Sequence, residues 1–416
     1  MDARELWLPL AHELLPIVGP GGLLNAVLSR YLGTDASRMV HVTRYADVAE
    51  IWQRDEDFSV RGYDERMTET TGPFILGMNE PGRYTPEAAI LGRAVRREDA
   101  ALVQRLVAEE TASAIGRFRH TGRIDAIRDV ADPVCIRFAQ RYFGLEGPEP
   151  IRLLRLFQVV SWYIFTFFRD PVMRKAAASA AEELGTILDG IIQRRRAEGH
   201  IGDGDIMGRL LATAKDFRDG DHGVARSIAG LASGTLNAPI GLFANALNKL
   251  LGLDESTLAR VRELARSAAS GSADDAALLS TYVDEAERFG VFPSVLYRHA
   301  ERDAVIAAGT PRETRIPEGC TVVVWPSLGA FDAEVFDNPF AFQPGRPRQK
   351  YLSFGYGRHR CLGEHIGQAL VHQMMQGLFA LPGLRRAEGK AGRLVTRELH
   401  EANFPDGLVL EFDKPS

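Results

Sequence analysis

The amino-acid sequence predicts a mainly α-helical fold with small β-regions. From residue 86 to 145, apolar side chains recur at the spacing of an amphipathic helix, as in "AAILGRAVRREDAALVQRLVAEETASAIGRF". β-type runs become prominent only after about residue 303, beginning with "TRIPEGCTVVVWPS". With 416 residues, 45% hydrophobic and 25% charged, the chain can form a core large enough to enclose a cofactor. We find no internal repeat or convincing linker, so we expect a single domain over residues 1–416.

The first half of the chain is expected to contain most of the helices. Residues 1–60 mix short helical patterns with a β-branched run, "MVHV", which precedes the helix-like "YADVAEIWQR". Helices then continue until "GLEGPEP" breaks the pattern. An aromatic helix is expected at about 151–168, and a long amphipathic helix follows the break at "RDP" and runs to "RRRAEG".

The second half begins with two predicted loops, "GHIGDGD" and "FRDGDHG". Residues 223–252 are weakly polar and rich in Ala and Gly, which is typical of a buried helix. "FDNPFAFQPGRP" predicts an irregular, proline-rich connector. A helix is expected to open directly after Cys361, and "RLVTRELHEANFPDGLVLEF" predicts strands at the end of the chain.

Charge and cysteine content limit the classes of partner and compartment. The net charge of −5 gives no indication of nucleic acid or of an anionic membrane as a partner. The start of the chain lacks a basic region followed by a long apolar span, and the apolar run 156–168 is too short to cross a bilayer, so no signal peptide or membrane span is expected. Three cysteines make neither a disulfide framework nor a four-thiolate metal site, which favours a reducing, cytoplasmic compartment.

The decapeptide "FGYGRHRCLG", residues 354–363, places Cys361 between a glycine-rich loop and the first turn of a helix. Unpaired N–H groups and the helix dipole favour a thiolate there, and the glycines let a flat partner approach the sulfur. His359 and Arg360 add positive charge. The decapeptide alone leaves three interpretations: a structural thiol at a tight turn, which is the most common case, a nucleophilic or redox cysteine, and a thiolate ligand of haem.

This stretch resembles the haem-binding loop of cytochromes P450, F-x-x-G-x-[R/H]-x-C-x-G. Every fixed position is matched, by Phe354, Gly357, His359, Cys361 and Gly363. The resemblance implies the cytochrome P450 fold, an α-rich prism that encloses haem b (iron protoporphyrin IX). It implies that Cys361 is the axial thiolate ligand of the haem iron, that Phe354 shields the sulfur and that His359 lies near a haem propionate.

Three further matches follow the order of the family. "EAER" supplies Glu285 and Arg288, which resemble the E-x-x-R pair, and these side chains share one face of a helix. Arg346 in "FDNPFAFQPGRP" is similar to the second arginine that binds the same glutamate. Arg298 in "RHAERD" resembles the arginine that meets a haem propionate.

The predicted distal helix departs from the family pattern, in which an acid followed by an alcohol delivers protons during oxygen activation. In "GTLNAPIG", Asn237 takes the acid position and Ala238 the alcohol position, with Pro239 next; this register is favoured. A competing register places Ala232 and Ser233 there. In either register no carboxylate occurs between Gly223 and Leu253, and Pro239 is expected to kink the helix.

A second departure concerns the helix that usually supplies a His and an Arg to the propionates. Ala88 and Gly92 occupy those positions, and Arg93 or Arg96 is the expected substitute for cofactor binding.

Three functions remain open. The resemblance favours monooxygenation of a hydrophobic small molecule with O2, with electrons from separate proteins such as ferredoxin and ferredoxin reductase. The missing acid–alcohol pair favours a hydroperoxide isomerase or peroxygenase that needs no reductase. The third is a non-catalytic haem-binding protein. The aromatic helix would roof the substrate pocket, which predicts an apolar substrate.

Overall fold

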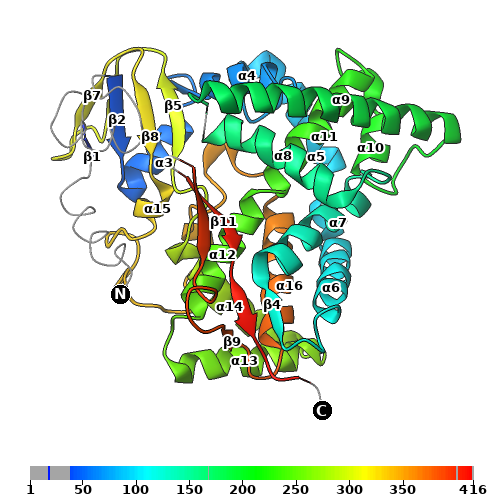
Figure 1. The fold of residues 1–416 in the computed structure, drawn as a ribbon. Helices are drawn as coiled ribbons and strands as arrows, with labels where there is room; N and C mark the ends of the chain where they lie inside the picture. Colours follow the sequence, from blue (N-terminus) through cyan, green and yellow to red (C-terminus); the bar gives the residue numbers. More distant parts are fainter. Residues whose placement is uncertain (1–16, 19–37, 167, 400–401, 415–416) are drawn as a thin grey trace.

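The computed structural model describes residues 17–18, 38–166, 168–399 and 402–414 (Figure 1). It is mainly helical with small sheets, as the sequence predicts. A sheet lies on one side of the molecule and the helices on the other (Figure 1). Apart from β1 (Ile17–Val18), the N-terminal stretch in which short helices were expected lies outside the described residues.

The largest sheet has five strands in the order β1-β2-β8-β5-β3. β2 (Met39–Val42) is the predicted "MVHV" run, and it pairs in parallel with β8 (Thr321–Val324), so that Val40 lies opposite Val322. β5 (Leu296–Ala300) and β3 (Phe58–Ser59) continue the sheet in antiparallel pairings. The valines pack against Val48, Ile51 and Trp52 of α3 (Tyr45–Gln53), because a β-branched face and the apolar stripe of a helix bury each other.

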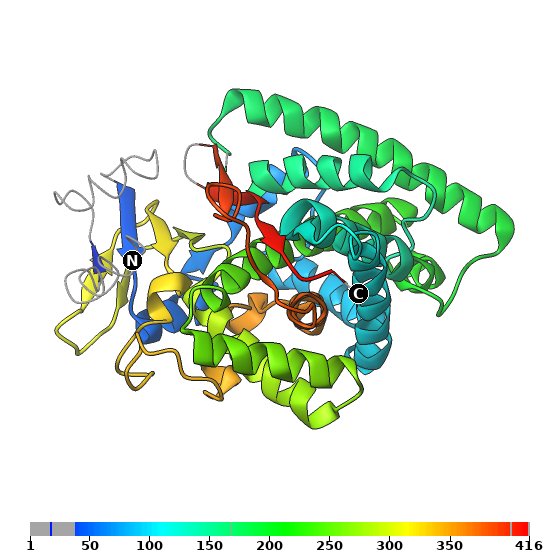
Figure 2. The same cartoon turned by 60° about the horizontal axis from the view of Figure 1, so that its bottom comes forward.

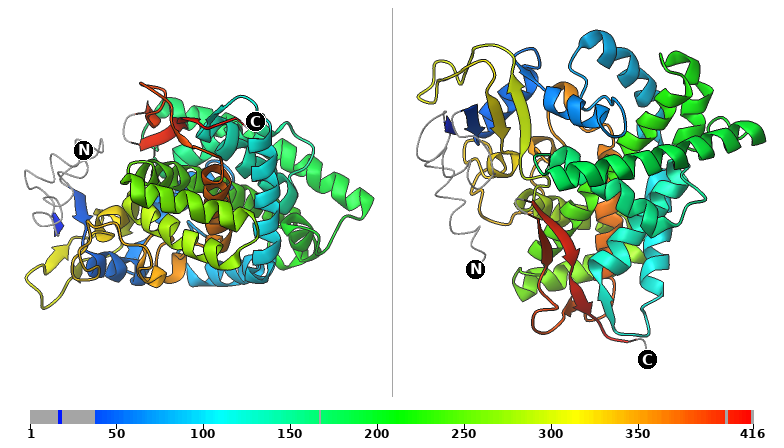
Figure 3. Two further views of the ribbon diagram at one scale, coloured as in Figure 1. Left: turned by 90° about the horizontal axis from the view of Figure 1, so that it is seen from below. Right: turned by 45° about the horizontal axis from the view of Figure 1, so that its top comes forward.

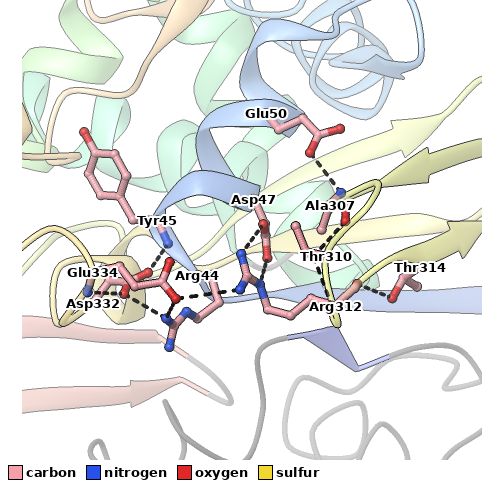
Figure 4. A network of polar contacts seen from close by, with 10 residues as sticks. All are labelled: Arg44, Tyr45, Asp47, Glu50, Ala307, Thr310, Arg312, Thr314, Asp332 and Glu334. Atoms are coloured by element: carbon pink, nitrogen blue, oxygen red, sulfur yellow. Dashed lines mark hydrogen bonds and ion pairs between the residues drawn. The ribbon is translucent and has the colours of Figure 1, made fainter.

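A polar network joins α3 to the segments around it (Figure 4). The Asp47 carboxylate accepts hydrogen bonds from Arg312, which precedes β7 (Thr314–Ile316), with a closest distance of 3.0 Å. The Arg312 segment follows β6 (Ala304–Ile306), the partner of β7. Glu50 accepts from the N–H of Ala307 at 3.0 Å. These contacts hold α3 in place, and the C-terminal end of α3 supports the cysteine loop described below.

The helices predicted from residue 86 to "RRRAEG" are present, with breaks where glycine and proline interrupt the pattern. They are α5 (Pro81–Ala94), α6 (Ala100–Gly116), α7 (Asp132–Tyr142), α8 (Pro150–Phe165) and α9 (Pro171–Glu198). Two helices that were not predicted, α4 (Arg61–Thr68) and α10 (Ile206–Ala212), flank them. Asp170 caps α9 by accepting from the N–H groups of Val172 and Met173, and Gly199 ends it with φ +72°. Figure 3 shows α9 lying across α8.

The predicted buried helix over 223–252 consists of two helices, α11 (Asp221–Thr235) and α12 (Ala238–Leu250), separated at Leu236 and Asn237. Within the described residues, Asp221–Leu250 is the one helical segment whose length and composition would suit a membrane span. However, 78% of its apolar window is buried inside the protein, which is the behaviour of a core helix.

The helices around α12 complete the core. α12 packs against α14 (Ala273–Phe289) and α16 (Glu364–Phe379), and α13 (Glu255–Ala269) packs against both of these. Residues 331–347 follow the short α15 (Pro326–Gly329) without a helix or strand, which confirms the predicted irregular connector.

The C-terminal strands are also confirmed. β10 (Val395–Leu399) and β11 (Ala402–Gly407) form one pair, and β12 (Val409–Glu411) lies between β4 (Arg123–Asp125) and β9 (Arg385–Arg386). Figure 2 shows the C-terminal strands, in red, against the helices, and β11 contacts α12.

Candidate active site

The loop of residues 354–363 is held between α3 and α16. The N–H of Cys361 donates to the carbonyl oxygen of Phe354 at 2.9 Å, which closes the loop. Gly357 has φ +71°, and a Cβ atom there would lie 2.4 Å from the carbonyl oxygen of Trp52 in α3, so only glycine fits. On the other side the Phe354 ring lies against Gly367 of α16, where a Cβ would be 3.0 Å from the ring.

The environment of the Cys361 thiol acts on its pKa in two opposing ways. Its side chain keeps accessible surface, and yet burial raises the pKa of the thiol to about 11, against a smaller lowering by a hydrogen bond from the N–H of Gly363. Desolvation therefore outweighs the effect of the helix N-terminus, from which the sequence predicted a thiolate. A positive metal centre at the sulfur would reverse this balance, because a coordinating thiol is deprotonated.

Beside this loop lies a cluster of polar groups whose donors are incompletely paired. Arg298 is 7% exposed, and its Nε has no hydrogen-bond partner among the described residues, while its Nη1 donates to the carbonyl of Tyr297 at 2.9 Å. The Nε2 of His359 also lacks a hydrogen bond and lies 3.9 Å from Oδ1 of Asp55. Burial, together with the charges of Arg298 and Arg358, lowers the pKa of His359 to about 3, so the imidazole is neutral.

The residue of α5 nearest this cluster is Tyr84, which the sequence reasoning missed. Its hydroxyl donates to the carbonyl of Arg358 at 2.6 Å, and its ring meets the His359 ring edge-on with centroids 5.2 Å apart. Its sequence signal is its position in the first turn of a helix opened by Pro81, which by itself does not indicate a cofactor contact.

Arg93 was predicted to bind the cofactor, and the structure places it elsewhere. It lies in the last turn of α5, where its exposed guanidinium pairs with Asp216 at 3.3 Å. Arg96, the alternative, pairs with Asp203 at 2.8 Å and is also exposed. Both side chains extend toward surface carboxylates, because the end of α5 lies near the segments that carry those acids.

Glu285 lies at the centre of a fully buried ion-pair cluster. Its carboxylate accepts two hydrogen bonds from Arg288, at 2.7 and 3.0 Å, and one from Nε of Arg346 at 3.3 Å. The hydroxyl of Tyr351 and the N–H of Gln343 donate to it as well, at 2.9 and 3.0 Å. Five donors surround one carboxylate, which is how a charge without solvent is stabilised. The cluster therefore attaches the irregular connector to α14. The cysteine loop follows this connector in the chain.

The break between α11 and α12 brings Asn237 into contact with α8. Asn237 is 7% exposed, and its Nδ2 donates to Oγ of the buried Ser161 at 3.1 Å. Ala238 and Pro239 are the first two residues of α12, and Pro239 has no N–H to offer the carbonyl of Thr235. The break thus falls within the favoured register, and the predicted kink is present.

The competing register centres on Ser233, which lies inside α11. It is 3% exposed, and its Oγ has no hydrogen-bond partner among the described residues. Ser161 was missed by sequence reasoning, since a serine in an apolar helix gives no signal for a partner 76 positions away.

Comparison with known proteins assigns the family. Residues 261–379, which include Glu285, Arg288, Arg346 and the cysteine loop, match the model of the family described as cytochrome P450. Over these residues the chain is similar to cytochromes P450. The crystal structure of P450BioI in complex with an acyl carrier protein superposes with a TM-score of 0.80 over 99% of this chain and 98% of that one, at 18% identity, which shows the P450 fold.

Two curated relatives illustrate the range of the family. A bifunctional dioxygenase–epoxy alcohol synthase of Fusarium oxysporum is 27% identical over 80% of this chain, and cytochrome P450 NovI of Streptomyces niveus is 25% identical over 86% of it. The alignment covers 84% of NovI but only 28% of the Fusarium protein. This P450 chain thus spans about a third or less of the length of its fungal fusion relatives.

As in the rest of the family, the cofactor is haem b, and the residues present fit it. Cys361 can offer a sulfur ligand, because its side chain keeps accessible surface. Arg298 keeps a buried Nε donor without a partner among the described residues, as expected of a group that meets a carboxylate of a porphyrin, and His359 lies beside it. Next to the sulfur, a Cβ at Gly363 would meet nothing closer than 3.9 Å, so the backbone leaves space there.

Proposed function

We propose that this P450 rearranges an organic hydroperoxide of a hydrophobic substrate and needs no reductase. One observation supports the proposal: the break between α11 and α12 falls at Asn237 and Ala238, which in the favoured register occupy the positions of the acid and the alcohol that would deliver protons. Between Gly223 and Leu253 the chain has no carboxylate at all.

The two candidate reactions differ in whether electrons, protons and O2 must be supplied to the enzyme. Monooxygenation consumes O2, two electrons and two protons and releases water, so a titratable relay is useful. Isomerisation of a hydroperoxide breaks the O–O bond and returns the released oxygen to the same molecule, so substrate and product have the same composition and electrons and protons balance internally. Haem with a thiolate ligand, when bound, supplies the O–O cleavage in either case.

The residues at the break are suited to the second reaction. An amide can donate and accept hydrogen bonds but does not ionise. With Nδ2 of Asn237 directed to Ser161, the carbonyl Oδ1 is free to accept the hydrogen of a hydroperoxide. Ala238 adds no proton source, and the apolar residues of α12 restrict water at the break.

The names of the relatives support this reading. Several fungal relatives are described as epoxy alcohol synthases or linoleate diol synthases. An epoxy alcohol and a diol of a fatty acid each have the same composition as a hydroperoxide of that acid. We therefore propose a fatty-acid hydroperoxide as the substrate class.

The same proposal assigns the cofactor contacts. Cys361 would ligate the iron through its sulfur, which Phe354 would cover, and Gly357 and Gly363 would keep the loop open. Arg298, His359 and Tyr84 would hold the propionates, and Glu285, Arg288 and Arg346 would stabilise the connector that carries the loop. We place the enzyme in the cytoplasm.

A second candidate is monooxygenation of a small molecule with electrons from ferredoxin and ferredoxin reductase. The relatives described as cytochrome P450 NovI and as the monooxygenase DoxA favour it. In this reaction a substrate hydroxyl or an ordered water would replace the missing alcohol.

An oxygen-label experiment distinguishes the candidates. Linoleic acid hydroperoxide carrying ¹⁸O in both peroxide oxygens is incubated with the haem-loaded enzyme under ¹⁶O2, without reductant, and the product is analysed by mass spectrometry. Isomerisation predicts a product that keeps both labels. Turnover of an apolar substrate only when ferredoxin, its reductase and O2 are added would overturn the proposal, and no turnover under either condition would favour a non-catalytic haem protein.

A further inference from the structure

Arg66 of α4 is an arginine enclosed by aromatic rings. Its guanidinium carbon lies 4.7 Å from the centroid of the Tyr63 ring and 4.3 Å from that of Phe168. Tyr63 belongs to α4, whereas Phe168 lies in the connection between α8 and α9. The guanidinium is thus held between two elements by stacking, which orients its fork of donors.

Among the described residues, no carboxylate forms an ion pair with Arg66. Nε and Nη2 are buried without a hydrogen-bond partner among the described residues. Glu69, one turn further along α4, is occupied, because it accepts from the hydroxyl of Tyr163 at 2.6 Å and from Arg174 at 2.7 Å. Burial lowers the pKa of Arg66, and Tyr63, Tyr297, Tyr163 and Glu65 oppose this only in part.

Arg226, a buried arginine, provides a comparison. Arg226 of α11 is also enclosed, and Glu87 and Asp219 both bind its guanidinium through paired hydrogen bonds of 2.6–3.1 Å. Unpaired buried donors of a charged group are costly. The cost at Arg66 is removed when an anion binds there, and the unpaired Nε and Nη2 suit the planar, bidentate geometry of a carboxylate.

The groups around Arg66 lead toward the distal helix. The Tyr63 ring contacts the Phe165 ring of α8 with centroids 5.6 Å apart. Phe165 and Ser161 are four residues apart on α8 and share one face of that helix, and Ser161 binds Asn237. A continuous series of contacts therefore joins the unpaired cation to the break between α11 and α12, and its aromatic members offer an apolar surface to a hydrocarbon chain.

We propose that Arg66 binds the carboxylate of the substrate and that the substrate is a long-chain acid whose hydrocarbon chain runs along Tyr63 and Phe165 toward Asn237. This rests on the proposed function for the hydroperoxide group, and it adds the acid head group and its binding residue. Two aromatic rings against the guanidinium favour a singly charged carboxylate on an apolar chain over a strongly hydrated phosphate.

The test measures binding of linoleic acid and of methyl linoleate to the haem-loaded enzyme by equilibrium dialysis. The wild-type enzyme is expected to bind the acid about 10-fold or more tightly than the ester, the range of one charge-assisted contact. Arg66→Met is expected to remove most of this preference while ester binding stays within about twofold. With the hydroperoxide as substrate, KM should change more than kcat.

Arg61→Met is the matched control, since Arg61 lies on the same helix but is half exposed and pairs with Glu301 at 3.3 Å. It should leave the acid-to-ester preference unchanged. Equal binding of acid and ester by the wild type, or equal weakening of both in Arg66→Met, would overturn the proposal. If Arg66→Met does not fold, the wild-type preference and its partial retention in Arg66→Lys decide the question. Neither ligand carries a peroxide, so these results are independent of the oxygen-label experiment.

Discussion

In the proposed reaction, Asn237 is the residue that replaces the acid of the family pattern. It is buried, its side chain donates a hydrogen bond to Ser161 of α8, and it lies at the break between α11 and α12. A neutral amide can make all of these contacts. A carboxylate at this position would serve proton delivery, whereas an amide can only hold and orient an oxygen atom.

Replacement of Asn237 by alanine should lower hydroperoxide turnover by about 10-fold or more, the effect of losing one positioned hydrogen-bonding group, with little loss of bound haem. Turnover and haem content are measured on the same preparation, the latter by absorbance. Ser233→Ala is the matched variant, because Ser233 represents the competing register and is also buried. A larger loss of turnover in Ser233→Ala would favour that register, and equal loss of turnover and haem in Asn237→Ala would make Asn237 structural.

Single residues also show where sequence reasoning was sufficient. The positions 354–363 and Glu285, Arg288 and Arg346 could be identified because each belongs to a short pattern with fixed spacing. The contacts of Ser161, Tyr84 and Arg66 could not, since each depends on segments that are distant in sequence and meet only in the fold. Arg93 was misplaced because its charge was considered without the direction of its helix face.

At the scale of elements, periodicity and proline predicted most of the helices. The amphipathic patterns located α6, α8 and α9, and Pro239 predicted the interruption between α11 and α12. Pro239 lies just after the break rather than within it, because proline fits the first turn of a new helix.

The cysteine loop allows two backbone effects to be separated. Gly355 and Gly357 both have positive φ, +73° and +71°, but an added Cβ at Gly355 would meet nothing closer than 3.7 Å, whereas at Gly357 it would lie 2.4 Å from the Trp52 carbonyl. Gly355→Ala should therefore cost about 1–2 kcal/mol of stability, from φ alone. Gly357→Ala should cost clearly more and should reduce haem incorporation. Urea unfolding and haem absorbance measure both, and equal effects at the two positions would show that the contact with α3 is unimportant.

The sheet contains a buried histidine that should make stability depend on pH. His41 of β2 is fully buried, its Nδ1 accepts from Nε1 of Trp325 at 3.1 Å, and burial lowers its pKa from 6.5 to about 4. Because the folded pKa is below the unfolded one, the unfolded chain binds the proton more readily between these values. Stability is therefore fully present above pH 6.5 and falls as the pH decreases toward 4, by roughly 3 kcal/mol for this group.

His41→Asn keeps an acceptor for Trp325 but does not titrate, so the loss of unfolding free energy between pH 7 and pH 4.5 should be smaller than in the wild type. Urea unfolding at the two pH values measures the difference. His200→Asn is the control, since His200 is exposed, and it should keep the wild-type slope. An unchanged slope in His41→Asn would mean that His41 is protonated in the fold at pH 4.5.

At the scale of the whole molecule, the proposed sites form one path. Arg66 lies where α4 meets the connection between α8 and α9, Asn237 lies at the break of the distal helix, and α8 contacts both regions through Phe165 and Ser161. Such a path would present one position along an acid chain to the haem, and its length would select that position.

A hydroperoxide isomerase requires a reaction that makes its substrate, and the chemistry identifies the class: a dioxygenase that adds O2 to a fatty acid. The Fusarium relative is described as carrying a dioxygenase in the same chain, and this protein aligns with only 28% of that chain.

A coupled reaction tests this expectation: linoleic acid, O2, a separate fatty-acid dioxygenase and this P450 are combined without reductant. We expect epoxy alcohols or diols in place of accumulated hydroperoxide. Chromatography with mass spectrometry measures both the products and the hydroperoxide. Arg66→Met should let more hydroperoxide accumulate at low substrate concentration, because capture of the acid is weakened, whereas Arg61→Met should not. Hydroperoxide that accumulates equally with and without the wild-type P450, and is consumed only after a reductase is added, would contradict the isomerase and return the protein to the reductase-dependent members of its family.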